Sequence, residues 1–157
     1  MQINDILFRI TKALSLTTDD LVKLYALAEY DISEERIESI LKRRQDKEYK
    51  EAGYEDLGLF LDGLVLFKRG ISDRVAKEDD VVDLTNNLIM KKLRVALELK
   101  EPELVIIFAL ADTALTKRQI GALFRKEGTK NFKSASDELL MAFIEGLDEF
   151  YYDGVEI

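Results

Sequence analysis

The chain has 157 residues, of which 47% are hydrophobic, and it contains one proline, no cysteine and no histidine. This composition is sufficient for a folded core, and it excludes disulfides, thiolate nucleophiles and sites built on imidazole. A formal net charge of −8 disfavours a general nucleic-acid binder. No apolar run approaches the ~18 residues of a membrane helix, and the first residues lack a signal-peptide pattern. We therefore expect a soluble cytoplasmic protein with no membrane contact.

The first two predicted elements are short helices. Residues 3–14 place apolar side chains at the i, i+3, i+4, i+7 spacing of an amphipathic helix. Asn4 stands near its start, and we interpret it as a cap or first-turn residue whose side-chain oxygen accepts an orphan backbone N–H. Thr17 or Thr18 caps the second helix, and the following Asp19–Asp20 pair suits the positive end of its dipole.

Two more helices complete the first unit. Ser33 and the acids after it predict the start of a third helix, and a polar loop then leads to a fourth helix around residues 57–67. Gly63 lies in the middle of this fourth helix, where glycine costs about 1 kcal/mol relative to alanine. We expect a close helix crossing at Gly63, in a place where no Cβ fits.

The same four elements return in the second half of the chain. Residues 4–67 realign on residues 87–150 at a constant offset of 83 without a gap, and 20 of the 64 pairs are identical. Asn87 repeats Asn4, and Gly146 repeats Gly63. Most identical residues are apolar or small, so the copies share mainly a core pattern, which indicates one supersecondary unit used twice.

The second copy has features of its own. The segment VIIFALA, residues 105–111, is apolar on nearly every side, which predicts the central and most buried helix of this repeat. Thr116 and Gln119 have the spacing of a capping box at the start of its third helix.

The fold class expected is all-α, with two tandem four-helix repeats packed into one compact helical protein. The first repeat spans residues 1–69, an acidic linker spans 70–85, and the second repeat with a C-terminal tail spans 86–157. A unit of about 65 residues is marginal alone because small domains bury a smaller share of their surface. The two copies are therefore expected to pack on each other.

The order of these motifs supports a resemblance. The pairing of NDILFRITKALSLTTDDLVKLYALA with NNLIMKKLRVALELKEPELVIIFALA, together with ALFRKEGTKNFKSASDELLMAFIEGL, resembles the YehS-like family over about residues 3–148. These are bacterial tandem-repeat proteins of unknown function, so the resemblance implies a fold and no activity, cofactor or catalytic residue. Relatives often carry His and Cys where this chain has Thr129 and Ala135.

Carboxylate pairs are the first candidates for chemistry. Asp19–Asp20, Glu34–Glu35 and Asp79–Asp80 are adjacent residues, which on a helix point about 100° apart and do not converge on one ion. The first two pairs stand at predicted helix starts, where acids stabilise the dipole. No nucleotide-binding, phosphate-loop, nucleophile-elbow or calcium-loop motif is present. We therefore expect no catalytic residue, no metal site and no cofactor.

One surface stretch differs between the copies. Residues 116–133 contain six bases and one acid, whereas the matched residues 33–50 contain six bases and five acids. Such a run is most often a solvated face; as a site, it would bind an anion or an acidic partner. Its internal counterparts would be the acids Glu78–Asp80 of the linker or Asp148, Glu149 and Asp153 near the end. The candidate binding residues are Lys117, Arg118, Arg125, Lys126, Lys130 and Lys133.

The sequence favours a non-enzymatic helical interaction or binding module. Its partner is an unknown protein or a second copy of the chain. The alternative is a weak nucleic-acid or anion binder that uses the basic face of the second repeat, which the net charge makes less favourable. An enzyme without His or Cys is the third possibility.

Overall fold

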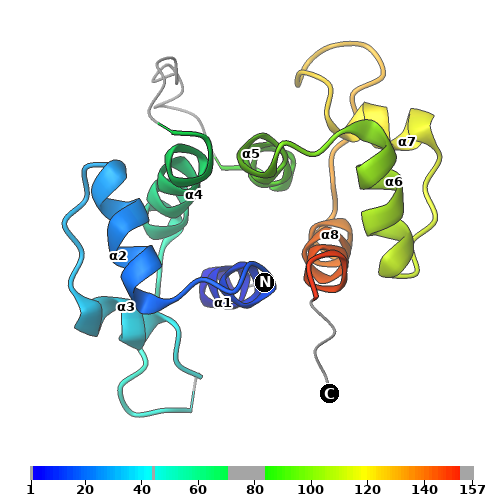
Figure 1. Cartoon of the computed structure of the whole chain (residues 1–157). Coiled ribbons are helices and arrows are strands. Elements are labelled where there is room, and N and C mark those ends of the chain that lie inside the picture. Colours follow the sequence, from blue (N-terminus) through cyan, green and yellow to red (C-terminus); the bar gives the residue numbers. More distant parts are fainter. Residues whose placement is uncertain (1, 44, 71–83, 153–157) are drawn as a thin grey trace.

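The computed structural model describes residues 2–43, 45–70 and 84–152, and these residues form helices joined by loops (Figure 1). The predicted linker centre, residues 71–83, and the tail beyond residue 152 lie outside the described ranges. None of the described helices is long and apolar enough to cross a membrane. The helices are α1 (Ile3–Ala13), α2 (Thr18–Leu27), α3 (Glu34–Ile40), α4 (Tyr54–Arg69), α5 (Asn86–Leu97), α6 (Glu101–Leu110), α7 (Lys117–Leu123) and α8 (Asp137–Phe150).

The helix bounds repeat at the offset of 83. Both ends of α2 and α3 fall on both ends of α6 and α7, and α1 and α4 begin where α5 and α8 begin. The loops repeat as well: Ser15 and Glu98 have positive φ after the first helix of each repeat, and Glu29 and Asp112 have positive φ after the second. The expected all-α fold of two four-helix repeats in one register is confirmed.

The two repeats pack on each other through their first and fourth helices. α1 lies against α8, and α4 lies against α5, while α2 and α6 cover the outer sides of α4 and α8 (Figure 1). Exchanging each helix for its repeat equivalent turns the α1–α8 contact into the α5–α4 contact. The chain therefore has the arrangement of a two-fold dimer within one polypeptide.

A continuous apolar core runs through this interface and into both repeats. Ile10, Leu64, Met90 and Leu147, one from each of the four inner helices, are almost completely buried. Each such side chain contributes about 1.5–3 kcal/mol relative to an exposed position. Separating the two repeats would expose these apolar side chains to water, which is why the repeats form one compact body.

Both mid-helix glycines lie at close crossings. A Cβ built on Gly63 would collide with the backbone carbonyl of Leu24 in α2, and a Cβ on Gly146 would collide with that of Ile107 in α6. Leu24 and Ile107 are themselves related by the offset of 83. The expected crossing is confirmed in both copies.

The expected position of the apolar segment 105–111 is wrong. It lies in α6, an outer helix, which buries Leu104, Ile107 and Phe108 and leaves Ile106 and Leu110 49% and 43% exposed. Only one face of α6 meets α8 and α7, so its remaining apolar side chains lie at the surface (Figure 1). A uniformly apolar helix gives no sign of which face its neighbours will cover. The helix that buries more of its length is α8, not α6.

Candidate functional site

The six candidate bases of the second repeat all lie at the surface. Lys117 and Arg118 open α7, whereas Arg125 and Lys126 follow its last residue and the cap Phe124. All six side chains are exposed, and we call this group the second-repeat basic surface: Lys117, Arg118, Arg125, Lys126, Lys130 and Lys133.

The loop after α7 folds back on the end of that helix. The Lys133 N–H donates to the Ala122 carbonyl at 3.0 Å, and tight turns join Thr129 to Lys126 and Phe132 to Thr129. The Thr129 hydroxyl also donates to the Lys126 carbonyl at 2.6 Å. The loop bases therefore gather at the C-terminal end of α7, while Lys117 and Arg118 lie roughly 10 Å away at its other end.

These bases have no acidic counterpart in the described part of the chain. Asp148, one of the expected internal partners, instead pairs with Lys12 across the repeat interface at 3.1 Å. Glu149 is exposed and is in no ion pair with the second-repeat basic surface, and the other proposed counterparts, Glu78–Asp80 and Asp153, lie outside the described residues. Arg125 and Lys126 stand beside the negative end of α7, which accounts for part of their placement.

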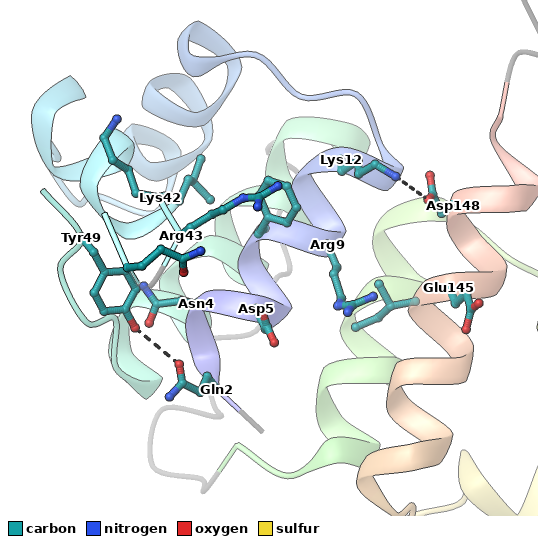
Figure 2. A pocket seen from close by; sticks show the side chains of 14 residues that line it. Gln2, Asn4, Asp5, Arg9, Lys12, Lys42, Arg43, Tyr49, Glu145 and Asp148 are labelled. Atoms are coloured by element: carbon teal, nitrogen blue, oxygen red, sulfur yellow. Dashed lines mark hydrogen bonds and ion pairs between the residues drawn. The ribbon is translucent and has the colours of Figure 1, made fainter. Parts of the chain in front are cut away.

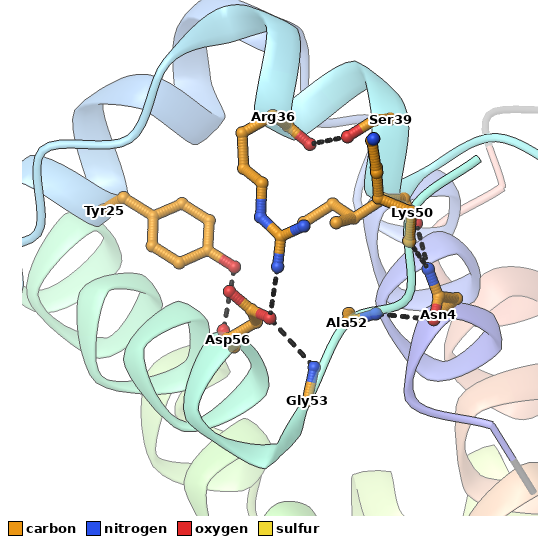
Figure 3. Close-up of polar contacts among 9 residues, drawn as sticks. Asn4, Tyr25, Arg36, Ser39, Lys50, Ala52, Gly53 and Asp56 are labelled. Carbon is orange, nitrogen blue, oxygen red and sulfur yellow. Dashed lines mark hydrogen bonds and ion pairs between the residues drawn. The ribbon is translucent and has the colours of Figure 1, made fainter. Parts of the chain in front are cut away.

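A buried asparagine holds the corresponding loop in each repeat. Asn4 Nδ2 donates to the carbonyls of Ile40 and Lys50, each at 2.9 Å, and its Oδ1 accepts the N–H of Ala52 at 2.9 Å (Figure 3). Asn4 lies in the first turn of α1, as one of the two expected placements has it, but it does not cap the helix, because its partners lie on α3 and in the following loop. The N-terminal flank of α1 is Gln2.

Asn87 makes the same three contacts in the second repeat. Its Nδ2 donates to the carbonyls of Leu123 and Lys133, and its Oδ1 accepts the N–H of Ala135, each at 2.9 Å. Asn87 likewise lies in the first turn of α5 without capping it, since Thr85 is the cap. We call each set of contacts an asparagine clamp. It joins the first helix of a repeat to both ends of the loop after the third helix.

The first repeat has a groove beside its clamp. A hollow of ≈ 610 Å³ lies between α1, the loop after α3 and the side of α8 from the other repeat (Figure 2). Phe8, which is 49% exposed, and the bases Lys42 and Arg43 line it together with Arg9. Its lining also includes Lys12 and three acids, Asp5, Glu145 and Asp148, so its charge is mixed.

A second polar cluster in the first repeat is structural. The Arg36 guanidinium donates to Asp56 Oδ2 at 2.9 Å, and the same oxygen accepts the Gly53 N–H at the start of α4 (Figure 3). The Tyr25 hydroxyl donates to the Asp56 carbonyl at 2.8 Å. Burial, and then the charge of Asp56, raise the pKa of Tyr25 above its usual value. The phenol is therefore protonated at neutral pH, in keeping with the hydrogen bond that it donates.

The carboxylate pairs contribute to helix starts. Asp20 Oδ2 accepts the Thr17 N–H at 2.9 Å, and Thr17 Oγ1 accepts the Asp20 N–H in return. Glu34 and Glu35 lie in the first turn of α3. Among the described residues no group of three carboxylates is arranged for a metal ion. Asp79–Asp80 lies outside the described residues.

Sequence reasoning missed the asparagine clamps and the groove. The signal for the clamps was present, because Asn4 and Asn87 are an identical pair with an uncharged polar side chain, and most of the other identical pairs are apolar or small. The groove had no such signal, since its wall on α8 belongs to the other repeat.

Comparisons with known proteins match both repeats. The family model described as "Protein of unknown function (DUF1456)" covers residues 4–70 and 86–151. The "Uncharacterized protein YehS" of Escherichia coli (strain K12) is 29% identical over 144 residues, which cover 92% of this chain and 92% of that protein. No solved structure matches the chain. The two matched segments coincide with the two four-helix repeats, and the chain belongs to this family of proteins of unknown function.

Proposed function

We propose that this protein is a non-enzymatic binding module that docks an acidic protein partner on its second-repeat basic surface. The observation that supports this is the exposure of six bases with no acidic counterpart among the described residues, on a chain of net charge −8. Complementary charge at such a surface accelerates association and selects the partner. Arg125 and Lys126 are its centre, because they project from the end of α7 beside the folded-back loop.

A protein partner is favoured over a nucleic acid. A phosphate backbone carries uniform negative charge, and the overall charge of this chain repels it outside the basic surface. A folded protein can confine its carboxylates to the face that meets the bases, so less of its charge lies against the acidic remainder of this chain. A second copy of this acidic chain also satisfies that requirement.

The test is capture from a native lysate with tagged wild-type protein and with Arg125→Glu combined with Lys126→Glu. The expected result is a defined protein that survives nuclease treatment and is lost in the double variant, while the thermal melt changes little because both side chains are exposed. Lys23→Glu combined with Lys100→Glu is the matched control, since both lysines are exposed and the net charge changes equally.

Three outcomes contradict the proposal. Recovery that disappears with nuclease assigns the surface to nucleic acid. Equal loss of the partner in the control pair reduces the effect to net charge. A marked loss of stability in the Arg125 and Lys126 variant, with no partner recovered at low salt, means that these bases are neutralised internally.

A further inference from the structure

Basic residues recur at four matched surface positions after the third helix of each repeat. Positions 42, 43, 47 and 50 correspond to positions 125, 126, 130 and 133 at the offset of 83. We infer that the first repeat carries a second docking surface, with a more mixed charge, for the same class of ligand, so that one chain binds two acidic polypeptide segments. This inference rests on the proposed function and extends it. The first-repeat basic surface consists of Lys42, Arg43, Lys47 and Lys50.

The exposed bases are matched between the two repeats, whereas most other exposed positions differ between them. Most of the identical pairs between the repeats are buried or partly buried apolar residues, which packing explains. Lys47 and Lys50 are identical to Lys130 and Lys133, and all four side chains are exposed. The exposed pair Glu55 and Glu138 has a structural reason, because both residues lie in the first turn of a helix.

No internal interaction accounts for the retained bases. Among the described residues, neither Lys47 nor Lys50 has an ion pair, and the same holds for Lys42 and Arg43. The dipole of a third helix stabilises a cation within about one turn of its end, which covers positions 42 and 43. It does not reach positions 47 and 50, so a shared binding role is what explains the lysines at these positions in both repeats.

The two surfaces have the same backbone frame. Each asparagine clamp fixes the carbonyl of position 50 or 133 at 2.9 Å from its Nδ2. The N–H of the same residue donates to the third helix, Lys50 to Ser39 at 3.1 Å and Lys133 to Ala122 at 3.0 Å. Lys50 and Lys133 are thus held at both backbone groups in matching positions, which presents the two lysines alike.

The two surfaces are separate sites. The loops after α3 and α7 lie at opposite corners of the molecule, on the outer ends of the two repeats (Figure 1). A short segment cannot span both, so occupation of both surfaces requires two segments or one large partner with two acidic faces.

The residues between the bases favour a ligand whose negative charges are spaced apart. Asp46, Glu48 and Glu51 alternate with the bases of the first loop, and their charges oppose any continuous row of negative groups, such as a phosphate backbone. A polypeptide places carboxylates at intervals. It also supplies apolar side chains, for which Phe8 offers a contact in the adjoining groove that Lys42 and Arg43 also line.

The test titrates the full chain with a short labelled peptide of alternating Glu and Ser residues at low salt and measures the binding stoichiometry by calorimetry. Wild type is expected to bind two peptides. Lys42→Glu with Arg43→Glu, and separately Arg125→Glu with Lys126→Glu, should each leave one, and the combination of all four should bind none. The control pair Lys23→Glu with Lys100→Glu should still bind two, because those lysines lie outside both surfaces.

Three results overturn the inference in distinguishable ways. One peptide per wild-type chain, lost with Arg125→Glu and Lys126→Glu but unaffected at positions 42 and 43, removes the second site and leaves the proposed function standing. Binding that no charge reversal at either loop changes removes both sites. Tighter binding of a single-stranded oligonucleotide than of the Glu-Ser peptide at equal salt assigns the paired surfaces to nucleic acid and overturns the acidic-polypeptide class.

Discussion

Replacing Gly63 by alanine tests the packing of the first repeat with one methyl group. Gly63 lies where α4 crosses α2, and the added Cβ would fall on the carbonyl oxygen and carbon of Leu24. These are backbone atoms of a packed helix, not the flexible end of a side chain. The clash is relieved only if α2 withdraws from α4 or its hydrogen bonds distort, and both changes loosen the core around the crossing.

Two opposing effects set the change in the free energy of unfolding that Gly63→Ala should cause. Overpacking of this kind costs about 1–3 kcal/mol, here at the upper end because backbone must move, and alanine recovers about 1 kcal/mol through helix propensity. We expect Gly63→Ala to lower the free energy of unfolding by about 2 kcal/mol. Gly58 in the same helix is the matched control: its Cβ would meet no atom within 4 Å. Gly58→Ala should therefore stabilise by about 1 kcal/mol.

Urea unfolding followed by circular dichroism measures both variants. The two alanine substitutions in α4 should move the urea midpoint in opposite directions. Their free energies of unfolding should differ by about 3 kcal/mol. Gly146→Ala should behave as Gly63→Ala, because the Ile107 carbonyl occupies the equivalent place. Equal shifts in one direction for Gly58 and Gly63 would refute the reasoning, since the crossing would then tolerate a Cβ.

Three further predictions use the same measurement. Asn4→Ala should lower the free energy of unfolding by about 3 kcal/mol, because three backbone groups lose their partner. Asn87→Ala should lower it by about half as much, because Asn87 is only half-buried and water replaces part of the loss. Equal losses in the two variants would contradict this prediction. Ile106→Glu should stay within about 0.5 kcal/mol of wild type, whereas Ile107→Ala, at a fully buried position of the same helix, should cost about 2–5 kcal/mol. The hydrogen bond from the Thr17 N–H lowers the pKa of Asp20 below its ordinary value of 3.8. The folded state therefore binds this proton less readily than the unfolded state, so the contribution is present above the ordinary pKa and is lost as pH falls through the lowered one. Asp20→Asn keeps the hydrogen-bond acceptor but does not titrate, so the free energy of unfolding should fall slightly less steeply towards acid pH. An unchanged slope would contradict this prediction.

The repeat and its helices were predictable from local patterns. A constant offset places the buried apolar positions of α1 to α4 in phase with those of α5 to α8. Thr116 forms the expected capping box with Gln119, and Thr17, one of the two expected caps, begins the second helix. Even the crossings at Gly63 and Gly146 followed from sequence, because a helix retains a costly glycine at matched places only where a side chain cannot fit.

Features that depend on tertiary contact were not predictable. The partners of Asn4 are 36 to 48 residues away, and no local rule separates a clamp from a cap near a helix start. The apolar segment in α6 has no polar face to show its orientation, so nothing in its pattern indicated that Ile106 and Leu110 would face solvent. The six candidate bases were located by charge alone, and their use as a site stays a prediction.

Docking of acidic polypeptides at the loops after α3 and α7 is tested most directly by nuclear magnetic resonance, which reports the amide of each residue. Isotope-labelled protein is titrated with the peptide of alternating Glu and Ser residues. We predict shifts confined to two regions, the amides around Lys42–Lys50 and those around Arg125–Lys133, with none along the exposed face of α6. Shifts centred on Ile106 and Leu110, or none at either loop at low salt, would contradict docking at these loops.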